Sequence, residues 1–443
     1  MIDYRALVAA MALCCVMGPP VAAQAPDPAA ASGSAWQSSA LSEVKDQIRA
    51  HYVFPEMRTP LVAAIEALEQ GGTLAPLSGT AFGDRVTRVM QDVAHDKHLA
   101  LVFDPNWAAS FAKQQDDPAA GDFDREAIRD NFGIVSLERL TGNIRYMKID
   151  GFGWVDDVTG ETYDAAARFL KAGSAIIIDI RGNSGGDHSA VRYLVSHFMK
   201  PDTPLYEFQS TREATWRSYA LDQLPAGRIN DVPLYVLIDG RTVSAGEDLA
   251  YQVQQYQLGK LVGTRTAGAA NNNEYFAVAG QFRLSLSVGR PVHPVSQTNW
   301  EGQGIQPDIA APTGEARDRA IIAATEQLLR NAAASPIERA EYRWAQEDAE
   351  ARLAPASYSA AQLRGYAGQY GDYLVKLSGS DLWLQAGNRD PLRMVPLKEK
   401  GQFGLAGRSY LRVRFAEGRL EVMPLGAPEP LVVPRTSPGQ RAN

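Results

Sequence analysis

The order of apolar and polar positions divides the chain into three regions of different style. From Leu41 to about His95, apolar residues recur at spacings of three and four, the period of a helix with one buried face. Short apolar runs and helical patterns alternate over residues 143–332, and after residue 360 short segments of alternating polarity are separated by Gly and Asp turns. These patterns predict an N-terminal helical cap, an α/β core and a small C-terminal antiparallel β domain, which we place at residues 41–113, 130–335 and 355–435.

The middle region has the pattern of a parallel sheet covered by helices. Strand-like segments occur at residues 143–149, 174–180, 233–239 and 260–264. Helical patterns lie between them at residues 188–199 and 244–257, and a closing helix is predicted at residues 320–332. Nearly continuous apolar strands that alternate with helices are typical of a largely parallel sheet with both faces buried.

The N-terminus has the features of a secretory signal peptide, predicted at residues 1–23. Arg5 supplies the positive charge, residues 6–16 form an uncharged apolar stretch, and Val21-Ala22-Ala23 offers small residues for cleavage. The apolar stretch is shorter than the roughly 20 residues of a membrane span. A lipoprotein signal is the alternative, but the small residue expected before the cysteine is missing. We therefore expect export, to a bacterial periplasm or beyond.

The segment after the signal, residues 24–40, is rich in Ala, Pro and Ser and predicts a flexible leader. Both cysteines, Cys14 and Cys15, lie inside the predicted signal. The processed chain would then have no disulfide, no thiol nucleophile and no cysteine-based metal site. Any covalent catalysis would depend on Ser, Thr or a carboxylate.

Composition limits the classes of partner. The chain of 443 residues has 44 Lys and Arg against 51 Asp and Glu, a net charge of −7, and 45% apolar residues. This is an ordinary globular composition, and it lacks the clustered basic residues that nucleic-acid binding needs. After the signal, no apolar run reaches the length of a membrane span.

Two segments carry candidate chemistry. In residues 176–190 an apolar strand runs into the turn Gly182-Asn-Ser-Gly185-Gly186, whose glycines permit positive φ angles or expose N–H groups to a ligand. In residues 236–253 a strand ends and Ser244 stands at the start of a helix. Taken singly, the first is also compatible with a plain strand-to-helix turn and the second with an ordinary N-cap.

Together these segments resemble the tail-specific, or C-terminal processing, serine protease family. The matching strings are Asp-x-Arg-x-Asn-x-Gly-Gly from Asp179, Thr-x-Ser-Ala-x-Glu from Thr242 and Glu-Gly-x-Gly-x-x-Pro-Asp from Glu301. The resemblance covers roughly residues 81–335. It implies a crotonase-like ββα superhelix core behind the helical cap.

The resemblance also implies roles for individual residues. Ser244 is the expected nucleophile, and the N–H groups of Ala245 and Gly186 are the expected oxyanion hole. Gly185 and His188 adjoin this turn and are expected to contact substrate. No cofactor and no metal are expected.

The base differs from the best-known branch of the family, which uses a lysine about 25 residues after the serine. Ala269 stands at that position here. The string Asp96-Lys97-His98-Leu99 resembles the segment of the tricorn protease core that supplies a histidine base, and Glu301 matches a glutamate of that site. The resemblance therefore implies His98 as base and Glu301 as the orienting third member.

Only 44 residues separate His98 from Asn143, too few for the peptide-binding PDZ module of the processing proteases. This shorter layout is similar to the modules of interphotoreceptor retinoid-binding protein. We predict an exported serine endopeptidase that cleaves peptides or unfolded proteins. The alternatives are a non-catalytic binder of hydrophobic ligands on the same scaffold and an esterase-type acyl hydrolase. The oligomeric state stays open.

Overall fold

The computed structural model describes residues 35–114 and 121–436. The predicted signal peptide at residues 1–23 lies outside the described residues. The first helix begins at Ala35, inside the segment predicted as a leader, because Trp36 packs its ring against Phe82 and Phe282 and thereby anchors the first turn.

The helices and strands have the following bounds. The helices are α1 (Ala35–His51), α2 (Pro55–Gln70), α3 (Gly79–Ala94), α4 (Pro105–Gln114), α5 (Gly121–Arg129), α6 (Asp156–Lys171), α7 (His188–Ser196), α8 (Ala245–Gln255), α9 (Ala316–Leu329), α10 (Pro336–Leu353) and α11 (Ala360–Tyr366). The strands of the first two sheets are β1 (Ala100–Phe103), β2 (Ile134–Leu140), β3 (Ile144–Ile149), β4 (Ala175–Asp179), β5 (Pro204–Ser210), β6 (Trp216–Tyr219), β7 (Leu234–Ile238), β8 (Lys260–Gly263), β9 (Asn272–Val278), β10 (Phe282–Val292) and β11 (Ile309–Ala310). The C-terminal strands are β12 (Gly368–Tyr370), β13 (Tyr373–Ser378), β14 (Asp381–Ala386), β15 (Leu392–Pro396), β16 (Gln402–Leu405), β17 (Leu411–Ala416), β18 (Arg419–Pro424) and β19 (Leu431–Pro434).

The central sheet has the strand order β11-β8-β7-β4-β3-β2, and all of its neighbouring pairs are parallel except β2–β3. Every residue of β4 and β7 is buried, which agrees with their continuous apolar sequence. Alternate residues of these strands face two different cores. Ile176 and Ile178 pack in the core of α6, α7 and α8, whereas Ala175 and Ile177 pack against α9 and α10. The four predicted parallel strands and the three predicted helices are confirmed here, although α9 begins four residues before the predicted start.

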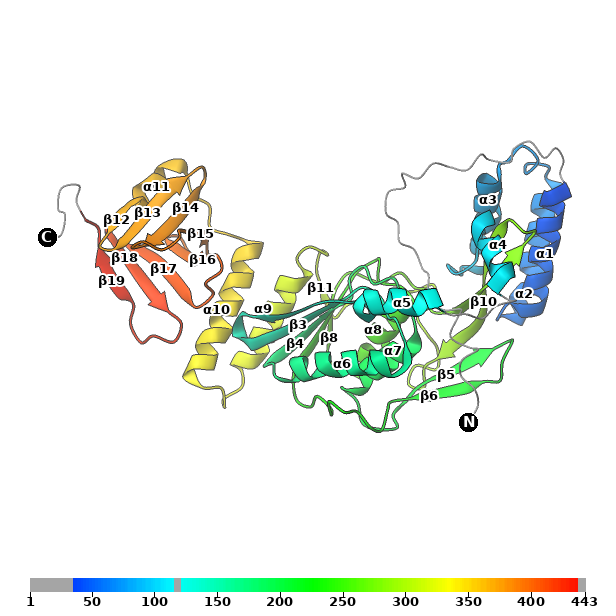
Figure 1. Cartoon of the computed structure of the whole chain (residues 1–443), viewed down its shortest axis with the longest axis horizontal. Coiled ribbons are helices and arrows are strands. Elements are labelled where there is room, and N and C mark those ends of the chain that lie inside the picture. Colours follow the sequence, from blue (N-terminus) through cyan, green and yellow to red (C-terminus); the bar gives the residue numbers. More distant parts are fainter. Residues whose placement is uncertain (1–34, 115–120, 437–443) are drawn as a thin grey trace.

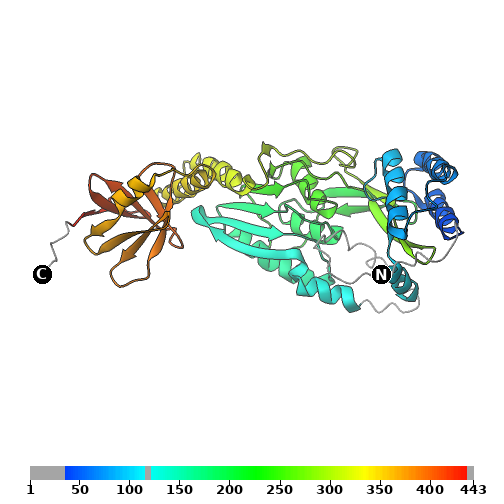
Figure 2. The ribbon, with the colours of Figure 1, turned by 90° about the horizontal axis from the view of Figure 1, so that it is seen from above.

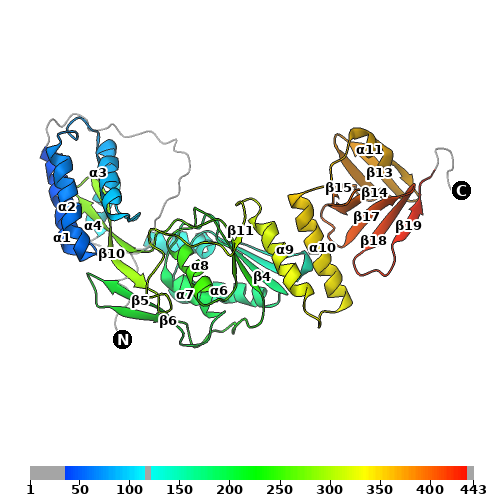
Figure 3. The same ribbon diagram turned by 180° about the vertical axis from the view of Figure 1, so that it is seen from behind.

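The cap is not closed by its own helices. Apolar residues of α1, α2 and α3 share one core with Phe282, Leu284 and Leu286 of β10, a strand that the sequence patterns did not predict. β10 pairs with β1 and β9 near the cap and with β5 further along, so it runs continuously from the cap to the core (Figure 3). A strand from residues 282–292 therefore completes the cap predicted at residues 41–113.

The C-terminal unit consists of eight antiparallel strands in sequential order, β12 to β19. Its last strand returns to its first, since Thr436 N–H donates to Gln369 O at 2.8 Å and Tyr370 bridges Arg435. Arg412 ties this unit to α10 through Asp348 at 2.6 Å. Figures 1 and 2 place the cap and this unit at opposite ends of the molecule, with the central sheet between them. No described helix has both the length and the apolar character needed to cross a membrane.

Candidate active site

The glycine-rich turn after β4 is held by two buried polar side chains. Asn183 is fully buried, donates to Ile149 O at 3.1 Å and accepts Gly185 N–H at 2.9 Å. Asp239 accepts Gly182 N–H at 2.9 Å. Gly185 and Gly186 have φ angles of 96° and 132°, which side-chain-bearing residues avoid. The turn is therefore a rigid element fixed to two neighbouring strands.

The ion pair of Asp179 and Arg181 lies at the end of β4, where the turn begins. Asp179 is buried and accepts hydrogen bonds from Tyr146 at 2.7 Å and from the Arg181 Nε at 2.9 Å. Burial opposes the charge of Asp179, but the bonds from Arg181 and Tyr146 outweigh it and lower the pKa of this carboxyl. These contacts show that Asp179 and Arg181 form an ion pair at the start of the turn.

Ser244 has a strained backbone at the start of α8. Its φ and ψ are 51° and −120°, a combination that is costly for a residue with a side chain. Its N–H donates to Glu247 Oε2 at 3.2 Å, which helps to hold this conformation. A Cβ placed on Gly185 would lie 2.8 Å from the Cβ of Ser244, so only glycine lets the serine sit against the turn.

Two predicted oxyanion donors adjoin Ser244. Gly185 O accepts Phe152 N–H at 2.8 Å, and Phe152 O accepts Asp187 N–H at 2.7 Å, a pairing that leaves the intervening Gly186 N–H pointing away from the bridge. Within the described residues, neither Gly186 N–H nor Ala245 N–H donates a hydrogen bond. Both residues line the same cleft as Ser244.

Glu247 is completely buried, and each of its oxygens accepts two hydrogen bonds. Oε1 accepts from Thr266 Oγ1 at 2.5 Å and Gly268 N at 2.7 Å, and Oε2 accepts from Ala269 N at 2.8 Å and from Ser244 N. Burial raises the pKa of Glu247, against the effect of these bonds. Ala269, at the position of the lysine in the processing proteases, thus serves as a backbone donor. The nearby Lys260 is exposed and pairs with Asp308 at 3.1 Å.

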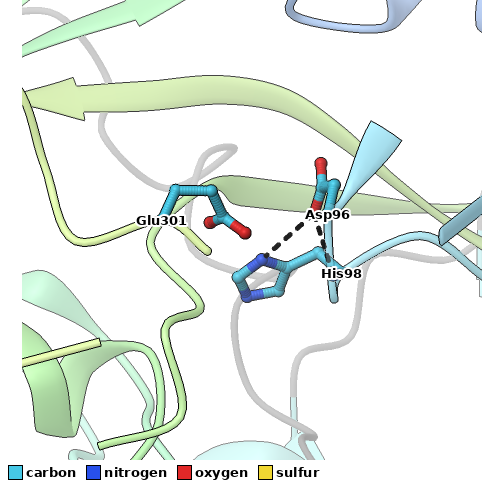
Figure 4. Close-up of side chains that lie close together, drawn as sticks. All are labelled: Asp96, His98 and Glu301. Carbon is cyan, nitrogen blue, oxygen red and sulfur yellow. Dashed lines mark hydrogen bonds and ion pairs between the residues drawn. The ribbon is translucent and has the colours of Figure 1, made fainter. Parts of the chain in front are cut away.

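The predicted base, His98, and the predicted third member, Glu301, lie close together with Asp96 beside them (Figure 4). His98, Glu301 and Asp96 bring ligand-type atoms within 4.8 Å of one another. Glu301 Oε2 accepts Ala270 N–H at 2.6 Å and Asn271 N–H at 3.0 Å, whereas Oε1 is buried without a partner. Burial, together with the nearby Asp96, raises the pKa of Glu301 to about 7.

His98 is held mainly through its backbone. Its N–H donates to Asp96 Oδ1 at 2.9 Å, but its ring Nδ1 lies 3.8 Å from that oxygen and has no hydrogen-bond partner among the described residues. Burial lowers the pKa of His98, against the effect of Asp96, which favours the neutral imidazole. No hydrogen bond joins His98 to Ser244 within the described part of the chain.

Asp96 is the residue of this cluster to which sequence reasoning assigned no role. It is buried and accepts hydrogen bonds from Tyr52 at 3.2 Å and from the side chain of Asn271 at 3.3 Å. The sequence does contain a feature that points to Asp96, because this residue belongs to the same Asp-x-His string as His98. Asn271, in contrast, had no local signal, because its partner lies 175 positions away in the chain.

The cleft beside Ser244 has aromatic walls and is narrow, with a cavity volume of about 50 Å³. Its lining residues are Gly186, His188, Tyr206, Phe208, Ser244, Ala245, Asp248, Ala270, Asn271, Asn272, Asn273, Pro291 and Trp300. His188, expected to contact substrate, lies in this lining. Its Nδ1 is 2.6 Å from Asp248 Oδ2 and its Nε2 is 2.7 Å from Ser218 Oγ, so both ring nitrogens are engaged.

A serine on a strained turn beside free backbone N–H groups is the arrangement that serine hydrolases use for the nucleophile and the oxyanion hole. Comparison with known proteins narrows the class. Residues 143–311 match the model of peptidase family S41. Residues 143–311 of this chain therefore form a peptidase family S41 domain, a family of serine-type peptidases, and the chain is similar to carboxyl-terminal processing proteases.

The relatives are distant. A carboxyl-terminal-processing protease of Picosynechococcus is 26% identical over 42% of this chain and 44% of its own length. The chloroplastic carboxyl-terminal-processing peptidase 1 of Arabidopsis thaliana is 25% identical over 40% of this chain and 36% of its own. The solved structure of the photosystem II D1 C-terminal processing protease is 13% identical, with 64% of this chain and 94% of that chain covered and a TM-score of 0.40. This chain thus matches less than half the length of the two curated relatives.

Proposed function

We propose that this protein is an exported serine endopeptidase that cleaves peptides or unfolded proteins through an acyl-enzyme. The observation that carries the proposal is the strained Ser244, set against a glycine turn whose Gly186 N–H is free and followed by the free Ala245 N–H. A plain N-cap serine needs no such strain, and strained backbone concentrates at functional sites. We also propose that the central region is the crotonase-like superhelix that the resemblance implies.

In the proposed mechanism, His98 Nε2 takes the proton of Ser244 as Oγ attacks the scissile carbonyl carbon. The developing oxyanion accepts the N–H groups of Gly186 and Ala245, a term worth about 3–4 kcal/mol per donor in related sites. His98 then returns the proton to the leaving amine, and water hydrolyses the acyl-enzyme by the same route in reverse. Catalytic hydrogen bonds often tighten only when substrate binds, so the missing Ser244–His98 bond is compatible with this mechanism.

Glu301 is proposed to orient His98 and to stabilise the imidazolium that forms. Its carboxylate lies in the cluster with His98, and Oε1 of this carboxylate is buried without a partner (Figure 4). A small rotation would let Nδ1–H donate to this oxygen or to Asp96, which would leave Nε2 free to accept the serine proton. This is the role that a carboxylate has in a serine-histidine triad.

The test is hydrolysis of an unstructured peptide library by wild-type protein and by the Ser244→Ala and His98→Ala variants. We expect both variants to lose cleavage. Loss of cleavage in Ser244→Ala but not in His98→Ala would support Ser244 as the nucleophile and refute His98 as the base. Absence of cleavage by the wild type, with hydrolysis of simple esters or uptake of a fluorescent fatty acid, would refute the peptidase proposal. Export is tested separately by N-terminal sequencing of the secreted chain, which we expect to begin at Gln24.

A further inference from the structure

The cluster of Asp96, His98 and Glu301 has hydrogen-bonding capacity that the described structure leaves unsatisfied. Two of its polar atoms, His98 Nδ1 and Glu301 Oε1, are buried without any hydrogen-bond partner in the described structure. The His98 side chain is only 5% exposed. Buried polar atoms are almost always paired, so two such atoms facing one small space indicate that something positively charged or protonated is held there.

The donor set fits a transition-metal ion. It comprises one imidazole nitrogen and two carboxylates, from the turn between α3 and β1 and from the loop before β11 (Figure 4). Zinc binds histidine nitrogen and carboxylate oxygen at about 2.0–2.2 Å, often with three protein ligands and one open position. Mg²⁺ and Ca²⁺ prefer oxygen ligands alone, so the histidine disfavours them.

The spacing requires only local adjustment. Ligand atoms around tetrahedral zinc lie about 3.3 Å apart, and Asp96 Oδ1 lies 3.8 Å from His98 Nδ1. All three candidate ligand atoms lie within 4.8 Å of one another. Glu301 Oε1 is free to move toward the others, because the bonds from Ala270 and Asn271 both hold Oε2.

We propose that Asp96, His98 and Glu301 bind one divalent transition-metal ion of the zinc type, and that the bound ion switches the peptidase off. The inhibitory part rests on the proposed function. A metal ion on Nδ1 leaves the single ring proton on Nε2. Nε2 is the nitrogen that must accept the proton of Ser244, so the metal-bound histidine is in the wrong tautomer for catalysis.

Metal binding is tested in the Ser244→Ala background, where hydrolysis plays no part. We expect calorimetric titration with Zn²⁺ to show one saturable site, and Asp96→Asn or Glu301→Gln to weaken it at least tenfold. Asp248→Asn is the matched control, because it alters another buried aspartate beside a histidine whose nitrogens are both engaged; it should leave the affinity unchanged. Thermal unfolding of each variant checks that it is folded.

Inhibition is tested in the wild type. Zn²⁺ should abolish peptide hydrolysis at the concentrations that fill the site, and EDTA should restore it, whereas Mg²⁺ should have no effect. Lack of saturable binding, or equal affinity in all variants, would overturn the site. Binding without inhibition would overturn the tautomer argument. Zinc binding by Ser244→Ala combined with a wild type that cleaves no peptide even after EDTA treatment would support the site while refuting the proposed peptidase.

Discussion

Two glutamates, the buried Glu247 and the half-buried Glu301, bind the same loop through different hydrogen-bond patterns. Glu247, on the nucleophile side, accepts four hydrogen bonds, among them the amides of residues 268 and 269. Glu301, on the base side, accepts the next two amides through one oxygen and leaves the other unpaired. The proposed nucleophile, Ser244, is thus fixed within the core, whereas the proposed base, His98, lies where cap and core meet, beside polar atoms that have no partner.

The two histidines near the site show the same contrast. His188 has both ring nitrogens engaged, by Asp248 and Ser218. Neither ring nitrogen of His98 forms a hydrogen bond within the described residues, so Nε2, the proposed proton acceptor, is free. The better hydrogen-bonded histidine is the poorer candidate for the base, because a general base needs a nitrogen that is free to take a proton.

The largest expected effect separates these histidines. His98→Gln should lower kcat/KM by about 10³-fold, within the range attributed to general bases, whereas His188→Gln should lower it less than about tenfold. Initial rates on one peptide substrate measure both. The reverse order would make His188 the base and remove His98 from the mechanism.

The next prediction concerns the nucleophile side. Gly185→Ala would place a Cβ 2.8 Å from the Ser244 Cβ, and we expect activity to fall about 10²-fold, as small displacements of catalytic groups can cost that much. Gly280→Ala is the matched control, since Gly280 also has positive φ but nothing within 4 Å. It should lower stability without lowering activity. Equal activity losses would refute the role of Gly185 in seating the serine.

Substituting each glutamate by glutamine tests whether the two sides differ in stability. An amide at residue 247 must turn its NH₂ toward two donors, so Glu247→Gln should lower the free energy of unfolding by about 3 kcal/mol. At residue 301 the NH₂ can take the place of the unpaired oxygen, and the remaining oxygen keeps both bonds. Glu301→Gln should therefore cost less than about 1 kcal/mol. Urea unfolding measures both values, and similar losses would contradict the hydrogen-bond count.

The smallest effect concerns pH. His293 is fully buried between the rings of Tyr206 and Tyr251, and burial lowers its pKa to about 4. Below about pH 6.5 the imidazole of His293 is protonated in the unfolded chain, whereas in the folded protein it stays neutral down to about pH 4. The free energy of unfolding should therefore fall as the pH falls from about 6.5 to about 4. The expected contribution is about 1.5 kcal/mol between pH 6.5 and 5.

The variant His293→Phe should lose that share of the pH dependence. His197, whose pKa burial also lowers, is present in both proteins and contributes equally to both curves. Urea unfolding at pH 5 and at pH 6.5 gives the change of the unfolding free energy with pH for each protein. Identical slopes in wild type and variant would show that His293 is protonated in the folded state.

Much of the nucleophile side was accessible from sequence. The strand, the glycine turn and Ser244 occur in two short segments, and the parallel strands are continuous apolar runs, so local patterns were sufficient to identify them. His98 and Glu301 were named only through resemblance to a family, because nothing in their own neighbourhoods brings them together. The strand β10 was missed because its role, to close the cap core, depends on helices more than 180 positions earlier in the chain.

The sequence by itself determined the local chemistry: which residues end buried strands, which glycines permit a tight turn, and which serine begins a helix. These features depend on backbone preference and short-range patterning. Only the tertiary structure decided that residues 268–271 bridge the two glutamates, that Asp96 joins His98 and Glu301, and that the cluster of these three residues keeps two unpaired atoms. Those facts depend on which distant segments come into contact. The burial that alters the pKa values of the side chains in these segments exists only after the chain has folded.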